Sequence, residues 1–237
     1  MKWYEKWFDE NYLKLYNHRD LADAQRQADL IVRTLKPSKD AAILDLACGE
    51  GRHCMIFHQR GYRISGMDLS ETLIRIGKQR HPQLDLFTGD MREIPGRYDI
   101  ILSLFTSFGY FDTDEENEQV VESVSAALNS GGWYWLDFLN PEHVRSKLVP
   151  ESESELADGS RAIERRRIDG ATVIKEIQLV ADGRTTGYEE RVRMYTRDEL
   201  ETFFRRHGII PEGAFGDYAG APHSAASERT IVYGRKQ

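Results

Sequence analysis

The sequence predicts an α/β protein, a doubly wound and mostly parallel sheet of seven strands with an antiparallel β insertion after the fifth. Two observations carry this prediction. Between residues 41 and 140, mainly apolar runs alternate with segments of helical periodicity, as in a parallel sheet covered by helices on both faces. After residue 150, alternating runs are separated by Asp-Gly, which is a strong β-hairpin signal.

The first part of the chain supplies a helical cap and five strands. Apolar residues recur at helical spacing up to Leu35, so we expect a cap over residues 1–36. The predicted strands are residues 41–48, 62–69, 84–90, 98–105 and 133–140. Ser70 is a suitable N-cap for one connecting helix, and two glycines at 131–132 are expected to end another, which starts at 114.

The second part contains the insertion and the end of the sheet. Within residues 151–195 we expect three antiparallel strands, at 161–169, 172–181 and 184–195. Thr196 and Glu199 then form a capping box at the start of a helix. Residues 209–217 and 229–236 read as two closing strands, so we expect a single domain over residues 1–237.

Composition excludes several classes of protein. The chain has 40% hydrophobic residues, which is ordinary for a globular protein. Its 32 basic and 39 acidic residues give a net charge of −7, and this negative charge is unfavourable for nucleic-acid binding. It contains no run of about 18 apolar residues, so we expect no membrane span. The two cysteines cannot form a disulfide framework, and we expect a reducing, cytoplasmic location.

The stretch "LDLACGEG", residues 44–51, predicts a nucleotide-like ligand. Gly49 and Gly51 follow a strand and open a helix, where glycines allow a ligand to approach the backbone. Asp68 stands nineteen residues beyond Gly49, at the end of the next strand, where a carboxylate accepts hydrogen bonds from ribose hydroxyls. Taken alone, this pattern suggests NAD.

Two features argue against NAD. Cys54 replaces the third glycine of the dinucleotide fingerprint, which permits close helix–strand packing over a pyrophosphate. The third strand also ends in an acid, Asp90, which can accept a hydrogen bond from an adenine amino group, with Met91 against the ring. The glycines, the acid for the ribose and the acid for the adenine together suit an adenosine ligand without pyrophosphate.

At these residues the sequence resembles the class I S-adenosylmethionine-dependent methyltransferases, in the order "LDLACGEG", "GMDLS", "GDM" and "YDIILSLFTSFGYF". The resemblance implies a Rossmann-like methyltransferase fold with S-adenosylmethionine as cofactor. It implies cofactor contacts from Asp45, Ala47, Gly49, Gly51, Asp68, Leu69, Asp90, Met91 and Leu104, and from Tyr16 and Arg26 of the N-terminal segment. Glu50 departs from the family pattern, which has Thr or Ser between the glycines.

The acceptor is expected to be a small molecule with an N or O nucleophile. The stretch "FTSFGYF", residues 105–111, lacks the Asn-Pro-Pro-Tyr type of motif of the family members that methylate nucleic acids. The chain is more similar to glycine N-methyltransferase and the nucleotide-sugar N,N-dimethyltransferases. In those enzymes an N-terminal segment covers the cofactor and an insertion closes the substrate pocket, which implies that residues 151–195 are a substrate lid.

Aromatic residues are expected at the substrate side, where their faces attract a sulfonium or a methylammonium. The residues predicted to face the substrate are Tyr12, Phe105, Thr106, Phe108, Tyr110 and Tyr218. Positioning alone can drive methyl transfer, so a base is not obligatory. If one acts, Tyr16, His143 and His223 are the candidates, although each also suits a packing or surface role. The histidines and cysteines lack metal-ligand spacing, so no metal is expected.

Three other functions compete with this interpretation. The first is an NAD(P)-dependent oxidoreductase, the second a methyltransferase of a protein or tRNA, and the third a module that binds the cofactor without catalysis. The expected partner is a small-molecule methyl acceptor, with neither nucleic acid nor membrane. A homodimer is the alternative to a monomer.

Overall fold

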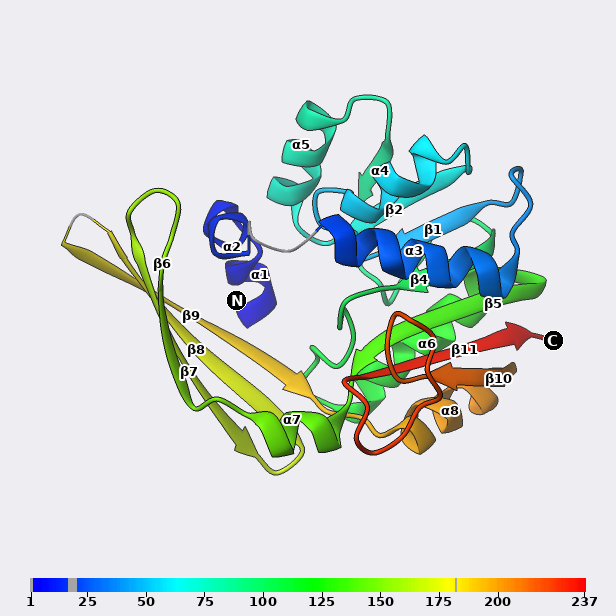
Figure 1. The fold of residues 1–237 in the computed structure, drawn as a ribbon. Coiled ribbons are helices and arrows are strands. Elements are labelled where there is room, and N and C mark those ends of the chain that lie inside the picture. Colours follow the sequence, from blue (N-terminus) through cyan, green and yellow to red (C-terminus); the bar gives the residue numbers. More distant parts are fainter. Residues whose placement is uncertain (1, 17–20, 182) are drawn as a thin grey trace.

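The computed structural model describes residues 2–16, 21–181 and 183–237, which form two sheets and the helices around them (Figure 1). The larger sheet has the strand order β10-β11-β5-β4-β1-β2-β3. Its strands are β1 (Ile43–Leu46), β2 (Ile64–Asp68), β3 (Asp85–Thr88), β4 (Tyr98–Ser103), β5 (Leu128–Leu139), β10 (Ile209–Phe215) and β11 (Arg229–Lys236). Strand β11 pairs antiparallel with both neighbours and the other pairings are parallel, which confirms the predicted sheet.

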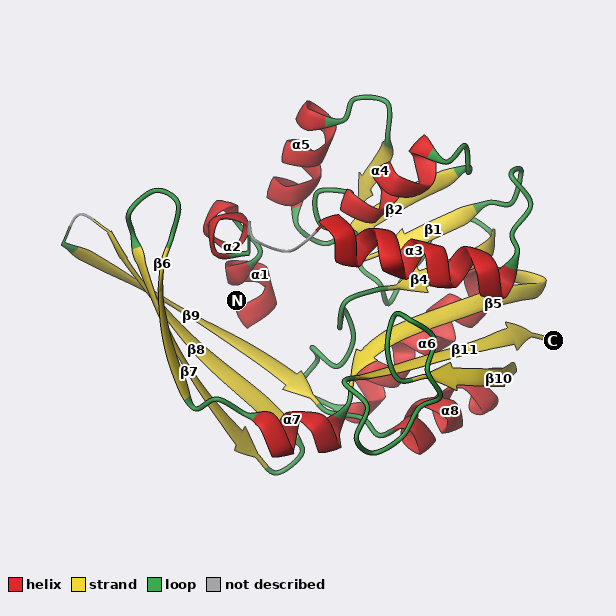
Figure 2. Ribbon diagram, viewed as in Figure 1, coloured by secondary structure: helices red, strands yellow, loops and turns green. Residues whose placement is uncertain are grey.

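Helices cover both faces of this sheet (Figure 2). The helices are α1 (Trp3–Trp7), α2 (Glu10–Leu15), α3 (Leu21–Leu35), α4 (Arg52–Gln59), α5 (Glu71–Arg80), α6 (Asp114–Ala127), α7 (Pro141–Lys147) and α8 (Arg197–Arg206). Residues of α3, α4 and α5 share one buried core, and residues of α6 and α8 share the other. No described helix has the length and apolar character needed to cross a membrane.

The helix starts follow the caps expected from the sequence. The Ser70 hydroxyl accepts a hydrogen bond from the backbone N–H of Leu73, which fixes the start of α5. Thr196 and Glu199 form the predicted capping box at α8. Because Ser70 lies only two residues after the end of β2 and its N–H donates to Asp68, this cap also fixes the turn that carries Asp68.

The predicted end of α6 at the glycines is wrong. The helix ends at Ala127, and Leu128 is buried, extended and paired with Tyr98 as the first residue of β5. Gly131 has φ 76° and lies where the register between β4 and β5 shifts. The glycines therefore serve an irregularity inside the strand, where their backbone freedom permits it.

The insertion forms a second sheet of four antiparallel strands, where the sequence predicted three. Its strands are β6 (Glu151–Glu155), β7 (Arg161–Asp169), β8 (Thr172–Ala181) and β9 (Arg184–Arg193), paired in that order. Strand β6 has the sequence "ESESE" and is almost wholly exposed, so it carries no apolar signal. It is held by its register with β7.

Helices α1 and α2 lie between the two sheets, at the left of Figure 1, where β6–β9 form a long curved layer. Trp7 is completely buried and its indole packs on Tyr188 of β9, with ring centroids 4.5 Å apart. On the other side, the Ser70 hydroxyl donates to the Phe8 carbonyl at 2.6 Å. The N-terminal helices thus contact both sheets. Part of the predicted 1–36 cap, residues 17–20, lies outside the described residues.

Candidate active site

A cavity of about 860 Å³ lies between the carboxyl ends of the parallel strands, the N-terminal helices and the second sheet. The loops after β1, β2, β3 and β4 all contribute to its wall. This is the crevice in which open α/β sheets bind ligands. The volume is within the usual range for small-molecule sites, roughly 300–1,000 Å³.

Asp68, at the end of β2, is fixed in the wall of the cavity. One carboxylate oxygen accepts from the Gly49 N–H at 2.8 Å, and the other accepts from the Ser70 N–H at 2.8 Å. Both bonds are charge-assisted and join the loop after β1 to the loop after β2. Burial nevertheless raises the pKa of Asp68. Each oxygen keeps a further lone pair, so the buried carboxylate can accept from two hydroxyls of a ligand.

Asp45 is a second buried acid, in β1 one residue before the strand ends. Burial raises the pKa of its carboxyl from 3.8 to about 7, a hydrogen bond from Cys54 opposes the rise, and the nearby Asp68 adds to it. The Cys54 thiol donates to Asp45 at 3.6 Å. A cation in the cavity would therefore find a carboxyl that ionises readily in its presence.

Asp90, after β3, is set differently. It lines the cavity together with Met91, and its carboxylate accepts from the Arg92 guanidinium at 2.6 Å. Burial would raise the pKa of Asp90, but the hydrogen bonds from Arg92 outweigh it and hold the pKa below the ordinary value. Asp90 is thus ionised, and both of its oxygens accept from Arg92, so a ligand amino group at this acid would share an oxygen with Arg92.

The two glycines of the loop after β1 have different surroundings. Gly49 lines the cavity, and a side chain there would meet only Leu73, at 4.0 Å. Gly51 does not line it: a Cβ there would meet the side chains of Leu86 and Leu84, at 3.1–3.2 Å. Its φ of 86° starts α4. Gly51 therefore serves helix–strand packing, and its predicted contact with the ligand is not supported by its position.

Cys54 accounts for the missing third glycine. Its sulfur lies where a side chain of Gly66, on β2, would otherwise stand, only 2.7 Å from that position. The small residue that close packing needs is thus on the strand, and the helix carries the larger one. Gly66 is visible in the sequence, but only the packing of α4 against β2 shows that this glycine makes room for Cys54.

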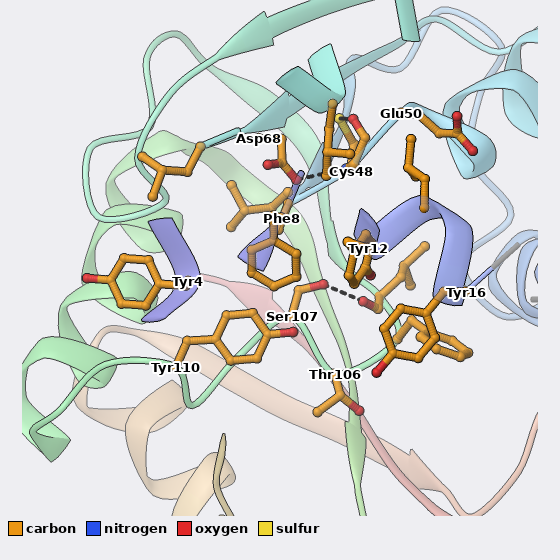
Figure 3. Close-up of a pocket in the computed structure, with 18 of the residues that line it drawn as sticks. Tyr4, Phe8, Tyr12, Tyr16, Cys48, Glu50, Asp68, Thr106, Ser107 and Tyr110 are labelled. Atoms are coloured by element: carbon orange, nitrogen blue, oxygen red, sulfur yellow. Dashed lines mark hydrogen bonds between the residues drawn. The ribbon is translucent and has the colours of Figure 1, made fainter. Parts of the chain in front are cut away.

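Aromatic rings form the other side of the cavity. Figure 3 shows Phe8 and Tyr12 lying between Asp68 on one side and Tyr110 and Thr106 on the other. The rings contact one another edge to face, with centroids 4.9 Å apart for Phe8 and Tyr12. Sequence reasoning found Tyr12, Tyr16 and Tyr110 but missed the lining residues Trp3, Tyr4 and Phe8. Their signal was the aromatic start of the chain, "MKWYEKWF".

The loop after β4 is strained at the predicted substrate-facing residues. Phe105 and Thr106 both line the cavity with positive φ, 57° and 67°. Left-handed backbone is costly for such residues and persists only where the surroundings enforce it. The buried Asp137 does so: its carboxylate accepts from the Phe105 N–H at 3.0 Å, and Arg229 bridges Asp137 to the Thr106 hydroxyl.

Two predicted substrate-facing residues lie outside the cavity wall. Phe108 is 1% exposed and packs in the core against Phe138 and Tyr195. The Tyr218 hydroxyl donates to Asp137 at 3.0 Å, and that residue therefore supports the loop after β4 from behind. Both are aromatic for packing, which a sequence pattern cannot separate from ligand contact.

Three further predicted residues also lie away from the wall. Arg26 is on the exposed face of α3 and pairs with Asp23. His143 is on α7, and the His223 ring lies 3.0 Å from the Thr230 hydroxyl. Of the candidate bases only Tyr16 lines the cavity, where its hydroxyl donates to Glu190 at 2.7 Å.

The remaining predicted cofactor residues do line the cavity: Ala47, Leu69, Met91 and Leu104. Ala47 has a positive φ of 59°, which turns the backbone after β1. Sequence reasoning missed the polar residues contributed by the second sheet, Arg166, Lys175 and Glu190. Within the described residues, no group of three or more His, Cys, Asp or Glu side chains is arranged to hold a metal ion.

Comparison with known proteins separates a methyltransferase from an oxidoreductase. Residues 43–132 match the family model described as a methyltransferase domain. The chain is 31% identical, over 82% of its length and 80% of the relative's, to dTDP-3-amino-3,4,6-trideoxy-alpha-D-glucopyranose N,N-dimethyltransferase of Streptomyces venezuelae. The chain belongs to the S-adenosylmethionine-dependent methyltransferases. The alternative of an NAD(P)-dependent oxidoreductase is therefore wrong.

Other relatives agree with this assignment. The methyltransferase is 28% identical, over 86% of its length and 81% of the relative's, to dTDP-3-amino-3,6-dideoxy-alpha-D-glucopyranose N,N-dimethyltransferase of Streptomyces fradiae. Its fold matches an S-adenosylmethionine-dependent methyltransferase from Clostridium acetobutylicum with a TM-score of 0.80, covering 95% of this chain and 96% of that one at 18% identity.

The residues present fit S-adenosylmethionine. A buried carboxylate with two free lone pairs suits the ribose diol, and an acid with adjacent Met91 suits an adenine. Gly49 leaves room beside the backbone, and Asp45 supplies a carboxyl beside the expected cation. Aromatic rings close the opposite side and favour a sulfonium.

Proposed function

We propose that this methyltransferase transfers a methyl group to the amine of a small, polar acceptor, of the amino-sugar class. The observation that carries the proposal is the single cavity that joins Asp68 and Asp90 to the aromatic and charged wall opposite. The named relatives act on amines of nucleotide-linked sugars, which supports an amine as nucleophile and a sugar as its carrier.

The cofactor side would hold the donor through Asp68, Asp90 and the backbone at Gly49. Bound S-adenosylmethionine supplies a methyl group activated by the positive charge of its sulfur. The carboxyl of Asp45, which lies buried near Asp68 in the same cavity wall, would stabilise that positive charge electrostatically. Asp68 fixes the loops after β1 and β2 relative to each other, which sets the direction of the donor.

The acceptor side would be formed by the loop after β4, the N-terminal aromatic residues and the second sheet. Thr106 and Phe105 are held by Asp137 and Arg229, so this part of the wall is rigid. The rings of Phe8, Tyr12 and Tyr110 exclude water and offer faces to a methylammonium product. Residues 151–195 are proposed as the lid of the acceptor site, and α1 and α2 as the cover of the cofactor.

No base is needed in this proposal. Tyr16 is the one candidate base at the cavity, and its hydroxyl already donates to Glu190 and accepts from Lys175. Its role is proposed as positioning. An uncharged amine has the lone pair that attack requires, and orientation can provide most of the acceleration.

The test is a methyl-transfer assay with a panel of small amines. The purified protein is mixed with S-adenosylmethionine and with amino sugars, free or linked to a nucleotide, or with a peptide that has a free N-terminus. Mass spectrometry then identifies the product. We expect the mass of one or two added methyl groups on an amino sugar. Exclusive methylation of the peptide would contradict the proposal.

We also propose a cytoplasmic location and a homodimer. The two cysteines are free and unbridged, which suits a reducing compartment. The outer strand of the second sheet, β6, is exposed along its length and has an unpaired edge that a second copy could meet. Light scattering coupled to size exclusion measures the oligomeric state, and a monomer at all concentrations would contradict the dimer.

A further inference from the structure

On β7, β8 and β9, the face of the second sheet that lines the cavity is mostly apolar, apart from Thr186 at its outer end and one band of charged residues. At one end Ala162, Ile177, Leu179 and Tyr188 pack around Trp7. At the other end Ile168, Val173 and Val192 pack against the core of the main domain. Between these apolar ends, the same face carries only charged residues.

The band is a row in direct cross-strand register. Arg166 on β7 pairs with Lys175 on β8, and Lys175 pairs with Glu190 on β9. All three line the cavity. Glu164, two residues before Arg166 on the same face, contacts Arg166 at 2.7 Å and Lys175 at 3.0 Å. The row therefore crosses the cavity-facing side of the second sheet from β7 to β9.

Stability alone does not explain this row. Two cations stand directly opposite each other, which is unfavourable in a sheet. Burial would raise the pKa of Glu164, but Lys175 and Arg166 outweigh it and hold the pKa down, so Glu164 is charged. Partly buried ion pairs seldom stabilise more than an apolar set of the same shape. Apolar residues at both ends of the face show that the sheet accepts them.

The hydrogen bonds of the row single out Arg166. The three protons of Lys175 are used by Glu164, Glu190 and Tyr16. Glu190 also accepts from Trp7 at 2.5 Å and from Tyr16 at 2.7 Å, and these bonds connect the N-terminal helices to β9. These two residues have little capacity left for a ligand.

Arg166 differs from both of them. Its guanidinium donates to the Ser152 hydroxyl at 2.9 Å and contacts Glu164, yet it carries five N–H groups in a rigid fork. With described residues these contacts involve only two of its nitrogens, Nη1 and Nη2. Its side chain is 22% exposed, and the residue lines the cavity. The remaining N–H groups suit the planar oxygens of a phosphate or carboxylate.

We propose that Arg166 anchors an oxyanion, a phosphate or a carboxylate, that the methyl acceptor carries besides its amine. This rests on the proposed function, because it names a second group on the same small-molecule acceptor. Glu164 and Lys175 act as positioning residues that hold the guanidinium toward the cavity. The acceptor class is then an amine with a negatively charged group at the opposite end.

Calorimetry with two probes, inorganic pyrophosphate and malonate, tests the anchor. The protein is first saturated with S-adenosylhomocysteine, so that the amino-acid part of the cofactor cannot compete for the probes. Arg166→Gln should weaken binding of the preferred probe at least tenfold, and Arg166→Lys should weaken it less, because it keeps the charge and loses the fork.

Arg165→Gln is the matched control. Arg165 is the neighbouring residue on β7, and its side chain is 49% exposed and pairs with Glu151 at 3.0 Å. It is absent from the cavity wall. The control should bind the probe within about twofold of the wild type, because screened surface charges contribute little.

The outcomes separate the sources of the anion and the two proposals. Preference for pyrophosphate indicates a phosphate-bearing acceptor, and preference for malonate indicates a carboxylate. The anchor is overturned if neither probe binds, if Arg166→Gln binds as the wild type does, or if Arg165→Gln loses as much. It is also overturned if Arg166→Gln weakens S-adenosylhomocysteine tenfold, which would assign Arg166 to the cofactor. The proposed function fails separately, if no small amine is methylated although S-adenosylhomocysteine binds. If Arg166→Gln does not fold, Arg166→Lys takes its place, and probe binding by Arg166→Lys equal to that of the wild type overturns the anchor.

Discussion

The two sides of the cavity are built by different means. The wall proposed to hold the cofactor consists of loops that each follow one parallel strand, and its key acid, Asp68, is fixed by two backbone N–H groups. The wall proposed to hold the acceptor adds to the loop after β4 the side chains of α1, α2 and three antiparallel strands, joined by ion pairs and ring contacts. A site made by local backbone geometry is readable in short motifs, whereas a site made by cross-strand pairing is not. The same difference predicts that single substitutions can disable one side and spare the other.

The largest effect is expected at Asp68. Asp68→Asn replaces one carboxylate oxygen with an NH2 group, which only donates, so at that position neither the backbone N–H nor a ribose hydroxyl finds an acceptor. Loss of two charge-assisted hydrogen bonds should cost about 2–4 kcal/mol of cofactor affinity. Titration calorimetry with S-adenosylhomocysteine measures it. The control is Asp85→Asn, at the start of β3, an exposed residue whose carboxylate accepts from the Ser65 hydroxyl and does not line the cavity.

The next largest effect, on stability, is expected at Glu190, which connects the N-terminal helices to the second sheet. Glu190→Gln keeps an acceptor for Trp7 and Tyr16 but leaves Lys175 with one carboxylate instead of two. Breaking a partly buried pair should lower the free energy of unfolding by about 2 kcal/mol. Denaturant unfolding measures the change. Glu189→Gln, on the opposite face of β9, should change it by less than about 0.5 kcal/mol, and equal losses would show that the row is not a specific link.

Sequence reasoning succeeded where function depends on the end of a strand. The acids Asp45, Asp68 and Asp90 lie at or near the carboxyl ends of β1, β2 and β3, and all line the cavity, as expected from the pattern. It also found the order of the sheet elements, because helical and strand periodicity are local. It missed β6, since "ESESE" has no apolar residue and the strand exists through its partner.

The acceptor side could not be read in the same way. Arg166, Lys175 and Glu190 are far apart in the sequence and meet only through the register of β7, β8 and β9. Aromatic residues posed the opposite difficulty. Phe108 and Tyr218 have the composition of a ligand site, yet one fills the core and the other supports Asp137.

A smaller effect should distinguish the two glycines. Gly51→Ala places a methyl group about 3.1 Å from Leu86 at a positive φ, so it should lower the free energy of unfolding by about 1–3 kcal/mol. Gly49→Ala has room, so it should lose only the backbone term, about 1 kcal/mol, but should weaken cofactor binding. Denaturant unfolding and calorimetry separate these results. Equal stability of both variants would contradict the packing role of Gly51.

The smallest effect is a pH dependence from Asp45. The folded pKa, about 7, is above the ordinary 3.8, so its contribution to stability is full below pH 4 and is lost as pH rises toward 7. A sulfonium beside Asp45 favours the ionised form, so binding of S-adenosylmethionine should release protons. Its affinity relative to S-adenosylhomocysteine should rise as the pH increases toward about 7, by at most about 1.4 kcal/mol per pH unit, and level off at higher pH. Asp45→Asn should abolish this dependence. An unchanged dependence in that variant would assign it to another group.

The most direct test of the central claim is calorimetry of S-adenosylmethionine and NADH with the wild type and Asp68→Asn. We infer that one cavity binds S-adenosylmethionine through the buried carboxylate of Asp68. We expect one bound S-adenosylmethionine per chain, no detectable NADH, and a loss of about 30-fold or more in the variant. Equal affinity of wild type and variant in a folded protein, or preferential binding of NADH, would contradict it.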